Sequence, residues 1–88
     1  MKPLAGKSVI LTGAGGGIGR PTALVLAAAG ARVVVSDIHA ANLEQTLDQV
    51  RGAGGEAIAI RADITQEDDL RALVQAAVAA FGSVVALV

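Results

Sequence analysis

One short stretch of this sequence has the residue types of a phosphate-binding loop. The segment Thr12 to Gly19 reads Thr-Gly-Ala-Gly-Gly-Gly-Ile-Gly and lies between an apolar run and an alanine-rich segment. Glycines at such a place let the backbone pass close to a phosphate, and the first N–H groups of the following helix can point at it. Asp37 closes the next apolar run, where a carboxylate can accept hydrogen bonds from ribose hydroxyls. Together these features predict a nucleotide site.

Other polar residues are weaker candidates. Asp63 follows a third apolar run, so its carboxylate could accept a hydrogen bond from an adenine amino group, and Ile64 could pair through its backbone. The alternative for Asp63 is an ordinary acidic turn before a helix. His39 is the only histidine and has no partners for catalysis, so we expect it at the surface. The acidic run 67–69 is expected to be the solvated first turn of a helix instead of a metal site.

The composition excludes several classes of protein. Seven basic and eight acidic residues give a net charge of −1, which does not support nucleic-acid binding. No apolar run approaches the roughly 18–20 residues of a membrane span, and the first residues do not form a signal peptide. The chain has no cysteine, which fits a reducing cytoplasm.

The apolar runs alternate with helical patterns along the chain. Strands are expected at residues 8–12, 32–36, 57–61 and 84–88, and helices at 18–29, 42–51 and 65–81, with Thr65 capping the third helix and Gly82 ending it. That third helix carries the clearest amphipathic stripe: Leu70, Leu73, Val74, Ala77, Val78 and Phe81. Such alternation predicts an α/β fold, a Rossmann-like fragment of three layers with a parallel sheet in the order 3-2-1-4. The first two helices should then cover one face and the third helix the other.

The glycine spacing is Gly13-x-x-x-Gly17-x-Gly19. With a threonine before it, this loop resembles the cofactor loop of the classical short-chain dehydrogenases/reductases. The likeness continues through the lead-in at 4–7, Asp37, the pair Asp63–Ile64 and the helix end at 81–82. It covers all 88 residues, which correspond to the amino-terminal part of such an enzyme.

The resemblance implies roles for seven residues. Gly13 would allow the tight turn, Gly17 with Ile18 would approach the pyrophosphate, and Gly19 would let the helix pack on the strand. Asp63 and Ile64 would contact the adenine, and Asp37 would select the cofactor. Gly15 and Gly16 are expected to be only a flexible loop.

Asp37 favours NAD over NADP as the cofactor. A carboxylate accepts hydrogen bonds from the ribose hydroxyls and repels a 2′-phosphate. Neither Gly16 nor Ile38 supplies the basic side chain that NADP would need. The alternative is that Asp37 is a solvated acid in a turn.

Catalysis in the family resembles hydride transfer promoted by a Tyr-x-x-x-Lys pair with a Ser and an Asn. This chain contains no tyrosine. We therefore expect residues 1–88 to be one NAD-binding half-domain that holds NAD or an adenine nucleotide by the ADP moiety and is not catalytic alone. Two alternatives stay open: the front part of an NAD-dependent oxidoreductase whose catalytic residues lie beyond Val88, and an engineered or excised half-fold with a mainly structural, self-assembling role.

The fourth predicted strand would be a sheet edge. Val85 stands in it where relatives often place an Asp, so an apolar side chain replaces a charge at this edge. We expect a homodimer that pairs the fourth strands of two copies.

Overall fold

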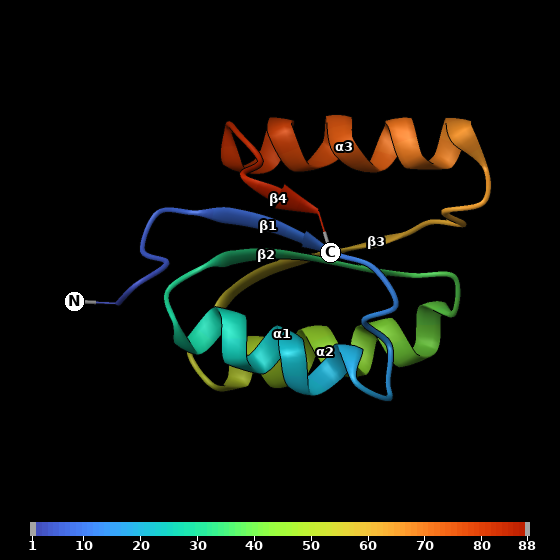
Figure 1. The fold of residues 1–88 in the computed structure, drawn as a ribbon. Helices are drawn as coiled ribbons and strands as arrows, with labels where there is room; N and C mark the ends of the chain where they lie inside the picture. Colours follow the sequence, from blue (N-terminus) through green and yellow to red (C-terminus); the bar gives the residue numbers. More distant parts are fainter. Residues whose placement is uncertain (1, 88) are drawn as a thin grey trace.

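Strands and helices alternate through the computed structural model, which describes residues 2–87 (Figure 1). The elements in chain order are β1 (Ser8–Leu11), α1 (Gly19–Ala28), β2 (Arg32–Asp37), α2 (Ala40–Gly52), β3 (Glu56–Arg61), α3 (Glu67–Phe81) and β4 (Ala86–Leu87). All strand pairs are parallel, and the sheet has the order β3-β2-β1-β4. The predicted α/β, Rossmann-like fold class is confirmed.

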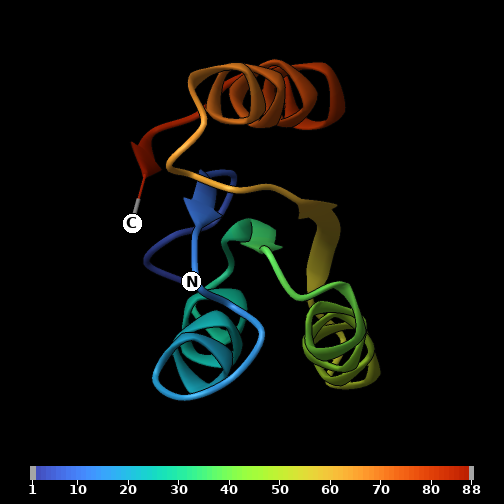
Figure 2. The same ribbon diagram turned by 90° about the vertical axis from the view of Figure 1, so that its right-hand side faces the viewer.

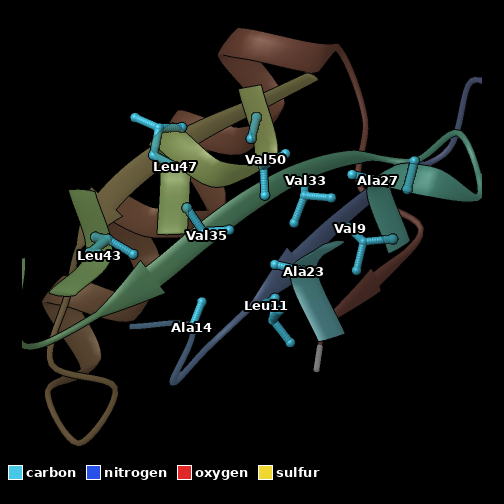
Figure 3. Close-up of a cluster of buried hydrophobic side chains, with 12 residues drawn as sticks. Val9, Leu11, Ala14, Ala23, Ala27, Val33, Val35, Leu43, Leu47 and Val50 are labelled. Carbon is cyan, nitrogen blue, oxygen red and sulfur yellow. The ribbon is translucent and has the colours of Figure 1, made fainter. Parts of the chain in front are cut away.

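The helices lie in two layers around the sheet. Figure 2 shows α1 and α2 together on one face and α3 alone on the other, as expected. Alternate side chains of each strand point to opposite faces, so Val33 and Val35 join the core under α1 and α2 while Val34 joins the core under α3. Figure 3 shows the first of these cores, which also contains Val9, Leu11, Ala14, Ala23, Ala27, Leu43, Leu47 and Val50.

The apolar stripe of α3 is only partly buried against the sheet. Leu73 and Ala77 are fully buried against the sheet, but 38% of Val74 and 44% of Val78 is exposed. The amphipathic stripe is therefore real, and one side of it faces solvent. Within residues 2–87, none of the helices combines the length and the apolar character that crossing a bilayer requires.

The start of α3 differs from its prediction. The helix begins at Glu67, and its N-cap residue Gln66 makes no side-chain cap hydrogen bond. The Thr65 hydroxyl instead donates to Asp63 Oδ1 at 2.6 Å, so the prediction that Thr65 caps the helix is wrong. Gly82 ends α3 with φ +83, which confirms the predicted end.

The fourth strand is also shorter than predicted. Its ladder with β1 is limited to Ala86 and Leu87, whereas a strand over 84–88 was expected; Val88 lies outside the described residues. Val85 precedes the strand, donates its N–H to the Ser8 carbonyl at 2.9 Å and exposes 56% of its surface. The remaining elements begin and end within two residues of their predicted limits.

Candidate functional site

A cleft opens at the edge of the sheet where β1, β2 and β3 end. It has a volume of about 320 Å³ and is lined by Thr12, Gly13, Ser36, Asp37, Ile38, Ala62, Asp63, Ile64 and Thr65. The carboxyl ends of parallel strands form the usual ligand crevice of such sheets, and this volume is at the small end of ligand pockets. The cleft brings together Gly13, Asp37, Asp63 and Ile64 of the predicted site.

The other three predicted residues do not line the cleft. Gly17 and Ile18 belong to the second half of the glycine loop, and Gly19 is the first residue of α1. Ile18 exposes 84% of its surface, so its side chain is not anchored in the core. The predicted site residues thus divide between a cleft and the start of the adjoining helix.

Glycine is required at three loop positions for two different reasons. Gly13 and Gly17 have φ of +65 and +54, a conformation that residues with a Cβ rarely adopt. A Cβ at Gly19 would overlap the Gly13 carbonyl oxygen and lie 2.8 Å from Ala14 Cα. The first residue of α1 therefore packs directly against the loop residues that follow β1, whereas the prediction had the helix pack on the strand itself.

Gly15 is not the flexible residue that was predicted. It is buried, and a Cβ there would lie 2.8 Å from Asp37 Oδ2 and 3.0 Å from Asn42 Cβ. A Cβ at Gly16, in contrast, would meet no other atom within 4 Å. The prediction for Gly15 is wrong because α2 and the end of β2 close over it, a contact that local sequence does not display.

Asp37 joins the end of β2 to the glycine loop. Its Oδ2 accepts the Gly15 N–H at 2.9 Å, and its Oδ1 accepts the His39 N–H at 3.0 Å. Ala14 donates its own N–H to the Ser36 carbonyl at 2.9 Å, so two successive loop residues are fixed to β2. The carboxylate thus lies at the boundary between the loop and the cleft.

These bonds favour the charged form of Asp37. Partial burial raises the pKa of its carboxyl, but the backbone hydrogen bonds from His39 and Gly15, with the charge of His39, more than compensate and hold the pKa below its usual value. Asp37 is therefore an anion at neutral pH, as recognition of ribose hydroxyls requires.

Asp63 also lines the cleft, just after the end of β3. Its Oδ1 accepts both the N–H and the hydroxyl of Thr65, at 3.0 and 2.6 Å, and these bonds lower the pKa of its carboxyl. Its own N–H donates to Asp69 Oδ2 at 2.9 Å. Asp63 therefore makes the acidic turn that was the alternative reading, and it also lines the cleft.

Two functional residues were missed by sequence reasoning. Arg20 donates to the Gly15 carbonyl at 2.6 Å and to Thr46 Oγ1 at 2.9 Å. Thr46 is fully buried and donates to the Ala14 carbonyl at 2.6 Å. A signal for Thr46 exists, since it is a polar residue on the buried face of α2 that Leu43, Leu47 and Val50 define.

The second half of the loop is left able to bind an anion. Within residues 2–87, the N–H groups of Gly16, Gly17 and Ile18 have no hydrogen-bond acceptor. They lie at the N-terminal end of α1, where the helix dipole favours negative charge. A phosphate oxygen is the group that such donors accommodate.

His39 is exposed at the N-cap of α2, as predicted. Among the side chains that the structure describes, no group of three His, Cys, Asp or Glu residues could hold a metal ion.

Known proteins resemble this chain over almost its whole length. The model of the short chain dehydrogenase family matches residues 7–88. The chain is 48% identical over 85 residues to 7alpha-hydroxysteroid dehydrogenase of Escherichia coli K12, which covers 97% of this chain and 33% of that protein. It is 49% identical over 82 residues to 2,5-dichloro-2,5-cyclohexadiene-1,4-diol dehydrogenase of Sphingobium indicum, covering 93% of this chain and 32% of that protein.

Solved structures show the same relationship. A 7alpha-hydroxysteroid dehydrogenase complexed with NADH and 7-oxo glycochenodeoxycholic acid superimposes with a TM-score of 0.93 at 48% identity, over 96% of this chain and 33% of that one. A short chain dehydrogenase/reductase of Burkholderia phymatum in complex with NAD gives a TM-score of 0.93 at 39% identity, over 99% and 31%. The chain spans about a third of the length of the relatives it matches.

Proposed function

Because this chain belongs to the short-chain dehydrogenase/reductase family, we propose that it binds NAD through the ADP moiety, with residues 1–88 acting as one half-domain. The observation that carries the proposal is the charged Asp37 carboxylate, fixed to the glycine loop at 2.9 Å and lining the cleft. Relatives of known structure contain NADH or NAD, which supports the same cofactor here.

Each part of the site has a role in this proposal. The unpaired N–H groups near Gly17 and Ile18 hold the pyrophosphate, while Gly13 and Gly19 shape the loop. Asp37 accepts hydrogen bonds from the ribose hydroxyls. Asp63 and Ile64, which line the same cleft, border the adenine. One oxygen of Asp63 is already bonded to Thr65, which leaves the second oxygen for the adenine amino group.

These residues bind and orient a nucleotide and do not by themselves transfer a hydride. When bound, NAD supplies the hydride acceptor of an oxidation. The chain has no tyrosine, and the proton transfer of the family depends on one. In the second candidate function, this chain is the front part of an NAD-dependent oxidoreductase, which the names of the matching dehydrogenases favour.

Calorimetry with ADP, NAD and NADP tests the binding proposal. We expect ADP and NAD to bind alike, in the micromolar to millimolar range of about 4–8 kcal/mol, since nothing in the proposed site holds the nicotinamide. Asp37→Asn should narrow the preference for NAD over NADP, because it removes the repulsion of the 2′-phosphate. Asp48→Asn, an exposed change on α2, is the matched control. An NAD affinity a hundredfold above that for ADP, or an unchanged preference in Asp37→Asn, would contradict the proposal.

We further propose that the protein is a cytoplasmic homodimer, in which the sheet edges formed by β4 in two copies pair with each other. The support is the exposed Val85 next to a short strand that is paired with β1, since such edges favour pairing with another chain. Light scattering should show a dimer that Val85→Asp weakens; a monomer at high micromolar concentration would contradict it. A mainly structural, self-assembling half-fold, the third candidate, would dimerise without binding any of the three nucleotides.

A further inference from the structure

We propose that Arg20 and Thr46 are positioning residues that fix the direction of two successive peptide groups in the glycine loop and so set its nucleotide affinity. The inference rests on the proposed function, because it concerns the same loop. Neither residue lines the cleft, so both act through the backbone.

The Thr46 hydroxyl is directed at the loop by Arg20. A helical threonine can donate to the carbonyl four residues earlier, which here is that of Asn42, 3.4 Å from Thr46 Oγ1. Arg20 Nη2 donates to that carbonyl at 3.0 Å, and Arg20 Nε donates to Thr46 Oγ1 at 2.9 Å. The hydroxyl proton is therefore used for the Ala14 carbonyl, at 2.6 Å.

The two loop carbonyls determine where the next N–H groups point. No peptide among the described residues is cis, and in a trans peptide the C=O and the N–H of the following residue point in opposite directions. With its carbonyl on Thr46, the Ala14 peptide turns the Gly15 N–H toward Asp37 Oδ2, which accepts it at 2.9 Å.

The next peptide obeys the same rule. The Gly15 carbonyl accepts Arg20 Nη2 at 2.6 Å, so the Gly16 N–H points away from the guanidinium. That N–H has no acceptor within residues 2–87. Arg20 thus leaves the Gly16 N–H available to a ligand oxygen. Thr46 keeps the Gly15 N–H directed at the Asp37 carboxylate, which is the proposed ribose-binding group.

Matched variants separate this role from a general loss of stability. Thr46→Val keeps the shape without the hydroxyl, Thr46→Ser keeps the hydroxyl, and Arg20→Lys keeps the charge without the fork. Arg51→Lys is the control, because the Arg51 guanidinium donates to a carbonyl, that of Ala57 at 3.0 Å, near the opposite end of α2.

The first measurement is the dissociation constant for ADP by calorimetry, alongside urea denaturation of each variant. We expect Thr46→Val and Arg20→Lys to bind ADP about tenfold more weakly, as loss of a charge-assisted or buried hydrogen bond implies. Thr46→Ser and Arg51→Lys should stay within about twofold of the parent protein. Arg20 is only partly buried, so Arg20→Lys is expected to fold even if Thr46→Val does not. Parent-like ADP binding by Arg20→Lys would overturn the inference.

The second measurement needs no ligand. Hydrogen exchange of the Gly15 amide should be about tenfold faster in Thr46→Val, because the peptide that aims it at Asp37 is released, and Thr46→Ser should restore its protection. Equal exchange in all three proteins overturns the inference. If the parent protein binds no ADP, the proposed function fails and the affinity part of the inference fails with it, whereas exchange at Gly15 still decides the peptide orientation.

Discussion

The substitution Gly15→Ala tests how closely the glycine loop packs against Asp37 and α2. A Cβ at Gly15 lies 2.8 Å from Asp37 Oδ2, about 0.6 Å short of ordinary contact. The carboxylate cannot retreat freely, because Gly15 and His39 each donate an N–H to one of its oxygens. On the other side Asn42 Cβ, at 3.0 Å, is fixed to the α2 backbone.

The expected cost follows from the bond that must give way. Loss of a hydrogen bond to a charged group costs about 1.5–3 kcal/mol, and replacing glycine regains about 0.4–1 kcal/mol through the unfolded chain. Gly15→Ala should therefore lower the free energy of unfolding by about 1–2 kcal/mol. For a domain of this size, each kcal/mol corresponds to about 4–8 °C in Tm.

Gly16→Ala is the matched control for this change. It has the same effect on the unfolded chain, and a Cβ there meets nothing within 4 Å, so we expect a gain of about 0.4–1 kcal/mol. Urea denaturation of both variants at one pH, with a common m-value, gives the comparison. If Gly15→Ala is as stable as Gly16→Ala, the close packing of Asp37 on the loop is refuted.

Three further predictions concern stability. The folded-state pKa of Asp37 is lowered, so its charge stabilises the fold above the unfolded pKa of about 3.9 and this contribution is lost as pH falls through the folded value; Asp37→Asn should flatten the acid limb of a stability–pH curve, and an unchanged limb argues against the bonds to its carboxylate. Leu73→Ala, at a fully buried position, should cost about 2–5 kcal/mol while the half-exposed Val74→Ala costs under about 1 kcal/mol; equal losses in urea denaturation would show that α3 does not pack as described. The buried Ser8 hydroxyl has no partner among the described residues, so Ser8→Ala should raise the free energy of unfolding by about 1 kcal/mol, and a loss would reveal a bond to that hydroxyl.

The elements and the position of the cleft could be predicted from local patterns. The run Val33 to Val35 predicts a buried strand, and the glycine spacing from Gly13 to Gly19 predicts a tight loop before a helix. Because parallel strands place their carboxyl ends at one edge, Asp37 and Asp63 could be assigned to the same cleft without coordinates. These predictions use only periodicity, turn chemistry and the handedness of crossovers.

The way in which the loop is held could not be predicted, because it depends on contacts across long stretches of chain. Arg20 reaches Thr46 across 26 residues, and Thr46 reaches Ala14 across 32. The local sequence shows no constraint on Gly15, because the residues that pack against it, Asp37 and Asn42, are distant in the chain. Thr65 stands where the sequence predicts a helix cap, but its hydroxyl donates to the carboxylate of Asp63, two residues earlier, and not to the backbone of α3.

The unequal cover of the two sheet faces has a consequence for how the cleft opens. Among the side chains that the structure describes, twelve buried residues form the core under α1 and α2, and five form the core under α3. Local unfolding begins where few apolar groups are buried, so α3 should open more often than the glycine loop. Asp63 is tied to α3 through Asp69, whereas Asp37 is tied to the loop. A nucleotide that touches both Asp37 and Asp63 would therefore slow the exchange of α3 amides that it never contacts.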